Sequence, residues 1–235
     1  MPPVQIVAHR GACSVAPENT RSALRIACEY GAPWAEVDVQ RTSDGTAVLV
    51  HDDTWERTAN KSATVRGTPW ETVDSFDVGS WFSQEFENEP VLRLDEVLQW
   101  TKHLSLNLEI KSPENDPGLA GCVAQAVRLA GVQQRTLLSS FDSATIASLA
   151  EDYADLRLAY LGHVPQQQMH PRVRWQILEA TALLRNPDWV EEVRQQGGTV
   201  WAWTVDQLQP AQRLVQLGVE GLITNQPQKL LAHFG

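Results

Sequence analysis

Cysteine is scarce in this sequence. Among 235 residues there are three, Cys13, Cys28 and Cys122, and their spacing matches no metal-binding motif. So few cysteines argue against a disulfide framework and fit a reducing compartment, which leads us to expect a cytoplasmic protein. We expect each of the three to be a small buried residue and not a nucleophile.

Basic side chains are also few. The chain has 19 Lys and Arg against 29 Asp and Glu, giving a formal net charge of −10 at pH 7. This balance argues against nucleic acid or an anionic membrane as a partner. No apolar run approaches the roughly 18 residues of a membrane-spanning helix, and the N-terminal residues do not resemble a secretory signal. An anionic substrate would need a local cation, such as a metal ion, to override the overall charge.

The chain shows no linker, no low-complexity tract and no GxGxxG motif after its first expected strand. Its 43% hydrophobic content suits one domain over residues 1–235 with a sizeable core. Strand and helix patterns alternate, which predicts a parallel sheet. With about eight strands we favour an α/β fold of the TIM (β/α)8 barrel type. An open doubly wound sheet is the alternative.

The strongest helix signals lie at the two ends of the chain. The first helix is expected over 19–31, with Asn19 as N-cap, and another begins with Asn186 as cap and Pro187 in its first turn. Residues 53–92 are tryptophan-rich and less regular. Further helices are expected at 94–102, 118–130, 143–151, 206–218 and from 227 onward. The expected strands are 4–9, 34–40, 46–51, 104–111, 135–140, 156–161, 199–205 and 220–224.

Charged side chains gather where the expected strands end. Alternation places Glu36 and Asp38 on one side of their strand, and the same rule aligns Glu109 with Lys111 on the next parallel strand. The carboxyl ends of barrel strands are where active sites form. The residues at these ends are His9, Arg10, Glu36, Asp38, His51, Glu109 and Lys111.

Three carboxylates directed at one point would repel one another, and a hard divalent cation such as Mg²⁺ or Ca²⁺ resolves the repulsion. Zinc would favour more histidine or cysteine nearby. Two histidines beside such an ion suit general acid/base catalysis, and two fixed cations can pair with an anionic oxygen. Each residue alone has an ordinary structural explanation, but the joint pattern predicts phosphoryl chemistry.

These residues lie within a longer pattern. The segments "AHRGA", "APENT", "EVDVQRTSDGTAVLVHDDTWERT" and "LNLEIK" occur in this order, followed by "SSFD", "WTVD" and "GVEGLITNQP". Together they resemble the glycerophosphodiester phosphodiesterase family over nearly the whole chain. Any one segment alone would be a weak match, whereas the ordered set is very specific.

The resemblance implies a TIM barrel with a small insertion at 53–92 after the second strand. It implies hydrolysis of glycerophosphodiesters, such as glycerophosphocholine or glycerophosphoethanolamine, to sn-glycerol 3-phosphate and an alcohol, with one divalent cation, Mg²⁺ or Ca²⁺. The site residues it implies are His9 and His51 as acid/base pair, Glu36, Asp38 and Glu109 as metal ligands, Arg10 and Lys111 as phosphate-binding cations, and Trp203 facing the glycerol or the leaving group.

The sequence departs from the family pattern in four places. "RTANKSA" lacks the usual glycines, and "VLRLDEVL" lacks a Pro-Thr-Leu stretch. "WTVD" replaces "WTVN", and "TN" at Thr224 and Asn225 replaces "TD". We expect none of these to touch a proposed ligand, base or phosphate contact. Glu18 and Asn19 of "PENT" are expected to have structural roles.

Two alternatives stay open. Hydrolysis of single-chain lysophospholipids of the lysophospholipase D type would need an apolar groove, which Trp55, Trp70 and Trp81 could supply unless they are buried. A non-catalytic barrel that binds phosphate ligands would predict a missing histidine or carboxylate, and none is missing. The head group, the metal, the nucleophile (water or a substrate hydroxyl), the order of the two histidines and a homo-oligomeric state are not decided by the sequence.

Overall fold

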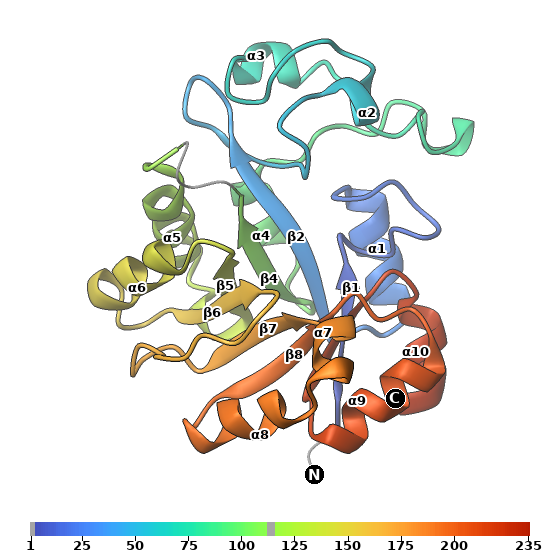
Figure 1. Cartoon of the computed structure of the whole chain (residues 1–235). Coiled ribbons are helices and arrows are strands. Elements are labelled where there is room, and N and C mark those ends of the chain that lie inside the picture. The colour runs from blue at the N-terminus through green and yellow to red at the C-terminus, as the bar shows by residue number, and fades with distance from the viewer. Residues whose placement is uncertain (1–2, 112–115) are drawn as a thin grey trace.

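Eight parallel strands close into a barrel in the computed structural model, which describes residues 3–111 and 116–235. Each strand pairs with the next in chain order, and β9 pairs with β1 to complete the ring. The predicted TIM barrel is therefore confirmed (Figure 1). The barrel strands are β1 (Gln5–His9), β2 (Trp34–Arg41), β4 (Ser105–Ile110), β5 (Thr136–Ser140), β6 (Arg157–Gly162), β7 (Trp175–Glu179), β8 (Thr199–Trp203) and β9 (Gly221–Thr224).

The membership of the barrel differs from the prediction at two strands. The expected strand 46–51 shortens to β3 (Ala47–Leu49), which pairs antiparallel with the end of β2 and lies outside the ring. The true eighth member, β7, was not predicted. It runs directly into α7 (Ala180–Arg185) without a glycine or proline between them, so no local signal separates the two elements.

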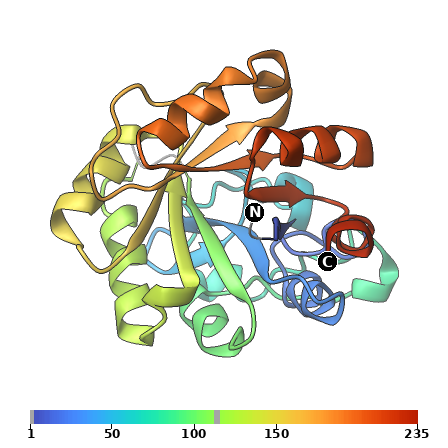
Figure 2. The ribbon, with the colours of Figure 1, turned by 90° about the horizontal axis from the view of Figure 1, so that it is seen from below.

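Helices lie around the outside of the strands, as Figure 2 shows from below. Those that follow barrel strands are α1 (Arg21–Glu29), α4 (Leu94–Trp100), α5 (Leu119–Ala130), α6 (Ser143–Asp152), α7, α8 (Asp188–Gln195), α9 (Leu208–Leu217) and α10 (Pro227–Phe234), with a short 3-10 turn η3 (Gln133–Arg135) before β5. No helix among the described residues is long and apolar enough to span a membrane.

The starts of two helices, α1 and α8, differ from the prediction by one residue. The N-cap of α1 is Thr20, whose side chain accepts from the backbone N–H of Ala23, and not Asn19. Asn19 has a φ of 59° and its side chain turns toward the barrel. The helix from 188 likewise starts one residue later than expected, with Pro187 at the cap position and not inside the helix.

The barrel interior is filled by large side chains from alternating strand positions. Trp34 of β2 and Trp201 of β8 meet edge to face, with ring centroids 5.2 Å apart. Separate apolar clusters pack the outer faces of the strands against the helices. The interior cluster contains Val7, Trp34, Leu137, Ala159, Leu161, Ile177, Trp201 and Ile223. At the amino end of β6, the Arg157 guanidinium lies over the rings of Trp34 and Trp175, 5.2 and 4.7 Å from their centroids. This packing fills the barrel below the charged residues at the carboxyl ends of β1, β2 and β4.

The segment between β3 and α4 forms a cap above the carboxyl end of β2 (Figure 1). It holds α2 (Glu56–Ala59), α3 (Trp70–Val73) and η1 (Gln84–Phe86). A small core of its own surrounds Trp55, which is fully buried and packs edge to face on Phe76. Trp55 therefore cannot line a groove, whereas the Trp81 side chain is partly exposed.

The cysteines are unpaired, but one expectation about them is wrong. Cys13 and Cys122 are partly buried, whereas Cys28 is exposed on α1. Cys28 lies one residue past Ala27, which is buried against the barrel, so the 3.6-residue period of the helix turns Cys28 outward.

Candidate active site

Strand register brings the predicted charged residues together at one edge of the barrel. His9 of β1, Glu36 of β2 and Asn107 of β4 are direct neighbours across the sheet. Two residues further along, Asp38 lies beside Glu109 in the same way. Because neighbouring residues of parallel strands face the same side, the two rows point into the carboxyl end of the barrel. Sequence alternation therefore predicted correctly that these side chains share one face of the sheet.

The three carboxylates form a cluster that could hold a metal ion. One oxygen from each of Glu36, Asp38 and Glu109 lies within 4.8 Å of the others. Glu36 and Asp38 are almost fully buried. Glu36 Oε1 has no hydrogen-bond partner among the described residues, and an orphaned buried carboxylate oxygen is costly unless a ligand completes it. The donor set consists of hard oxygens, which suits Mg²⁺ or Ca²⁺.

The electrostatics of the cluster support the same fit. Burial, and then repulsion from Asp38 and Glu109, raises the pKa of Glu36 well above its ordinary value. Burial and the charge of Asp38 also raise the pKa of Glu109. Burial alone would raise the pKa of Asp38 too, but the adjacent Arg10 and Lys111 lower it. Two protein cations are thus insufficient to compensate three buried carboxylates, and a divalent cation would supply the missing charge.

Arg10 and Lys111 lie against these carboxylates. Arg10 Nε is 3.2 Å from Asp38 Oδ2, and Lys111 Nζ is 2.9 Å from Glu109 Oε1 and 3.6 Å from Asp38 Oδ1. The turn that carries Arg10 is tight, since Gly11 has a φ of 80° and a Cβ there would lie 2.7 Å from Ala23. Glycine is therefore required for the "HRG" turn to pack on α1.

His9 is fixed from one side and open on the other. Its Nδ1 is 2.7 Å from Asn225 Oδ1, and its Nε2 is 3.8 Å from Glu36 Oε2. Burial, and then the charge of Arg10, lowers the pKa of His9. The imidazole therefore favours its neutral form, with Nε2 directed to the carboxylate cluster.

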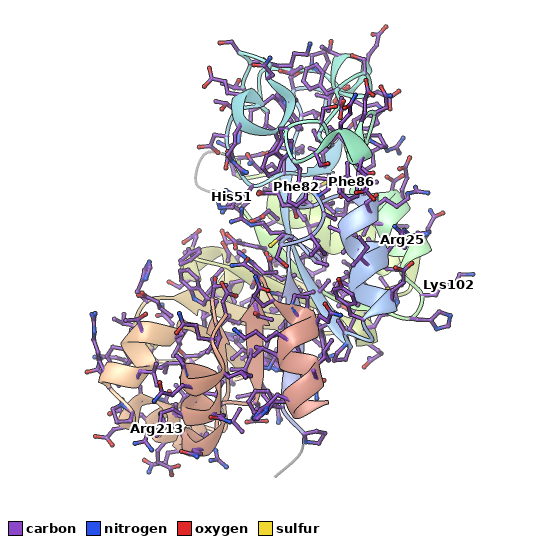
Figure 3. The ribbon with its side chains drawn as sticks, turned by 90° about the vertical axis from the view of Figure 1, so that its right-hand side faces the viewer. Arg25, His51, Phe82, Phe86, Lys102 and Arg213 are labelled. Atoms are coloured by element: carbon purple, nitrogen blue, oxygen red, sulfur yellow. The ribbon has the colours of Figure 1, made fainter. Side chains whose placement is uncertain are left out.

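His51 reaches the same cavity from the junction between the cap and the barrel, where Figure 3 labels it. Its Nδ1 is 2.7 Å from Asp52 Oδ1. The loop backbone is held from β2, because Gln40 Nε2 donates to the carbonyl oxygens of residues 50, 51 and 52 at 3.2, 3.1 and 2.7 Å. His51 is thus positioned by a buried glutamine that sequence analysis did not single out.

A cavity of about 320 Å³ opens above these groups, within the usual range for small-molecule sites. One wall is charged and carries the residues described above. The opposite wall is apolar and includes Phe141, Leu161 and Trp203. Phe141 and Trp203 meet edge to face with centroids 5.5 Å apart, and His163 lies 5.4 Å from Trp203. The eight predicted site residues lie together. Seven of them line the cavity, and Asp38 is buried behind this lining.

Two sequence expectations about neighbouring residues are wrong. Asn19 does not cap α1; its Nδ2 donates to Asp38 Oδ2 at 2.9 Å, and its Oδ1 accepts from the Asp38 backbone N–H at 3.1 Å. One departure from the family pattern also touches a proposed catalytic residue, because Asn225 bonds His9. Both contacts join residues far apart in the sequence, so no local pattern could indicate them.

Other residues of the site were only partly visible in the sequence. Asn107 shares the strand alternation of Glu109, and its Oδ1 accepts from Ser139 Oγ at 2.9 Å. Phe141 belongs to the quoted "SSFD" segment, and Arg57 to "ERT". Neither segment alone indicated which residues these two side chains would contact. Leu161 carried no signal, since it reads as one more apolar strand residue.

Comparisons with known proteins agree with this geometry. Residues 9–229 match the model of the glycerophosphoryl diester phosphodiesterase family. The chain is 32% identical, over 96% of each sequence, to a glycerophosphodiester phosphodiesterase of Caldanaerobacter subterraneus subsp. tengcongensis.

Solved structures give the same result. A phosphodiesterase of Oleispira antarctica, determined with the product sn-glycerol-3-phosphate, has a TM-score of 0.90 and 25% identity, covering 98% of this chain and 96% of that one. A glycerophosphodiester phosphodiesterase of Agrobacterium tumefaciens has a TM-score of 0.83 and 25% identity, covering 97% and 99%. The chain therefore belongs to the glycerophosphoryl diester phosphodiesterase family, and its enzyme class is that of a phosphoric diester hydrolase.

Proposed function

We propose that this enzyme hydrolyses small glycerophosphodiesters, such as glycerophosphocholine and glycerophosphoethanolamine, to sn-glycerol 3-phosphate and an alcohol, with one bound divalent cation. The observation that carries the proposal is the convergence of Glu36, Asp38 and Glu109 beside two histidines in one cavity. Arg10 and Lys111 stand on the same wall and would bind the phosphate oxygens. The barrel would act as a single catalytic domain over 1–235 that carries residues 53–92 as an insertion.

The two histidines have environments that suit opposite proton transfers. Asn225 Oδ1 can only accept, so Nδ1 of His9 carries the proton and Nε2 keeps a free lone pair. His9 would then take the proton from the nucleophile, whether that is water or the glycerol hydroxyl of the substrate. His51 has a carboxylate on Nδ1, whose charge offsets that of the imidazolium, and it would protonate the leaving alkoxide.

Glu36, Asp38 and Glu109 would hold the cation, and a divalent ion bound there would polarise a phosphoryl oxygen and offset charge developing on it. The chain's own cations keep the carboxylates in place around that position, since Arg10 and Lys111 both pair with Asp38. Asn19 adds two hydrogen bonds to the same aspartate.

Metal removal tests the proposal directly. Chelation followed by desalting should abolish release of sn-glycerol 3-phosphate from glycerophosphocholine, and added Mg²⁺ or Ca²⁺ should restore it. A matched isothermal titration with the Glu36→Gln/Asp38→Asn variant should show no binding of the ion that restores activity. Full activity of the exhaustively chelated enzyme would refute the role of the cation.

The apolar wall favours one second candidate, the hydrolysis of single-chain lysophospholipids. Phe141 is 46% exposed at the mouth of the cavity and could contact an acyl chain. Comparing kcat/KM for glycerophosphocholine and for lysophosphatidylcholine below its micellar concentration separates the two substrates. A larger value for the lipid would favour the second candidate. A cytoplasmic location and a homo-oligomeric state stay predictions.

A further inference from the structure

Asn225 stands directly behind the proposed base. It follows Thr224, the last residue of β9, whose register partner is Ala8 of β1. His9 is the next residue of β1, so the two side chains meet across the seam that closes the barrel. The contact of 2.7 Å joins His9 Nδ1 to Asn225 Oδ1. The seam therefore fixes which asparagine can reach the histidine, but not which end of its amide does so.

Asp206 decides the orientation of that amide. Asp206 Oδ2 lies 2.8 Å from Asn225 Nδ2, and Asp206 Oδ1 accepts from the Asn225 backbone N–H at 2.8 Å. An ionised carboxylate only accepts hydrogen bonds, so the NH₂ group must face Asp206 and the oxygen must face His9. Thr224 Oγ1 donates to Asp206 Oδ1 at 3.0 Å and holds the carboxylate in place.

Cys13 supports the same orientation from a third direction. Its Sγ lies 3.0 Å from Asn225 Oδ1. Burial raises the pKa of the thiol to about 12, so the group is an S–H donor at neutral pH. A donor at this position requires oxygen, and not the amide nitrogen, at the end that faces His9.

We propose that Asp206 and Asn225 are positioning residues for His9. By orienting the amide, Asp206 makes Asn225 accept the Nδ1 proton and leaves the Nε2 lone pair of His9 facing the cavity. This inference rests on the proposed function, in which His9 Nε2 receives the proton of the nucleophile. If the amide were reversed, its NH₂ group would require the other tautomer, with the proton on Nε2, and the base would be lost.

The two positions also coincide with two departures from the family pattern. "WTVD" has Asp206 where the pattern has Asn, and "TN" has Asn225 where the pattern has Asp. In the structure these side chains are hydrogen-bonded to each other. In this chain the residues at the two departures therefore face each other as amide donor and carboxylate acceptor.

The test compares Asp206→Asn, Asn225→Asp and the double variant Asp206→Asn/Asn225→Asp in the full chain, with saturating metal and glycerophosphocholine. Asp206→Asn should lower kcat by about tenfold to 100-fold with little change in KM, the usual range for the partner of a functional histidine. Asn225→Asp places two carboxylates about 3 Å apart and should be at least as damaging. The double variant should recover most of the lost kcat, because its amide again faces a carboxylate.

Nitrogen-15 NMR of histidine-labelled protein gives a readout that does not depend on turnover. The unmodified enzyme should show His9 as the Nδ1–H tautomer, and Asp206→Asn should add the Nε2–H tautomer. Asp155→Asn, at a surface aspartate paired with Arg128, is the matched control and should change neither kcat nor the tautomer.

Three results would overturn the inference: a normal kcat and tautomer in Asp206→Asn, a double variant no better than the worse single variant, or losses confined to thermal stability. These outcomes are distinct from failure of the proposed function. In that case the unmodified chain itself would release no sn-glycerol 3-phosphate, or His9→Ala would retain its activity.

Discussion

His9 and His51 face one cavity from regions built on different principles. His9 belongs to a barrel strand, its side chain is 20% exposed, and its partner is a neutral amide. His51 lies in a loop below the cap, its side chain is 34% exposed, and its partner is a carboxylate. Two residues of the same type thus have different hydrogen-bond partners, and this difference is the basis on which we propose His9 as proton acceptor and His51 as proton donor.

The region around His51 is a continuous ionic network. Arg57 of α2 donates from Nε to Asp52 Oδ2 at 2.6 Å and from Nη1 to Glu18 Oε2 at 2.7 Å. Glu18 Oε1 also accepts from Arg10 Nη1 at 2.8 Å. One guanidinium therefore links the partner of His51 to the partner of Arg10. The ion pairs of Arg10 and Lys111 with Asp38 also lie beside His9, but the hydrogen bond at His9 Nδ1 is made by the neutral amide of Asn225 and not by a member of this network.

The largest effect should come from removing either histidine. His9→Ala and His51→Ala should each lower kcat by about 10²-fold to 10⁴-fold, because each removes one proton transfer. Steady-state kinetics with glycerophosphocholine measures the loss, and thermal melting shows whether the fold is intact. The comparison is broken if either variant turns over at a near-normal rate, since that histidine would then have no part in the reaction.

The leaving group sharpens this experiment. If His51 is the acid, a substrate with a good leaving group, such as a nitrophenyl ester of glycerol phosphate, needs little protonation. The deficit of His51→Ala should then shrink by about tenfold or more, whereas the deficit of His9→Ala should persist. Equal deficits with both substrates would contradict the assignment of separate roles.

Much of the charged wall could be predicted from the sequence, because it depends on short-range regularity. Alternation along β2 and β4 placed Glu36, Asp38 and Glu109 on one face, and parallel pairing brought them together. The hydrogen-bond partner of His9 depends on the pairing of strands far apart in the sequence, which a local sequence pattern does not contain. Asn225 is 216 residues from His9, and its role appears only when β9 closes on β1. Local reasoning assigned Asn19 to a helix cap because asparagine and threonine are both good caps.

A smaller effect is expected from the network that supports His51. Asp52→Asn should lower kcat by about tenfold to 100-fold, since it removes the charge that offsets an imidazolium. Arg57→Ala should have a similar or smaller effect on kcat and should also raise KM, because Glu18 would lose a partner and hold Arg10 less firmly. Kinetics of both variants, with melting curves, measures these changes.

Arg57→Lys is the matched control for the network. Lysine keeps the positive charge but cannot make two bidentate pairs with Asp52 and Glu18. It should therefore fall between the unmodified enzyme and Arg57→Ala. If Arg57→Ala matches the unmodified enzyme in both kcat and KM, the network does not position the site residues. The two histidines would then differ in solvent exposure but not in the support they need from an ionic network.

The smallest effect should come from the apolar wall, which carries no proton and no charge. Phe141→Ala and Trp203→Ala each remove aromatic surface facing the substrate, and should raise KM by about threefold to tenfold while changing kcat less. A series of glycerophosphodiesters with different head groups locates the contact. A change in KM that is uniform across the series would place the rings against the glycerol, which all members share. A change that depends on the head group would place them against the leaving alcohol. If kcat fell as severely as in His9→Ala, the wall would be positioning a catalytic group, and the division into a reacting side and a binding side would be wrong.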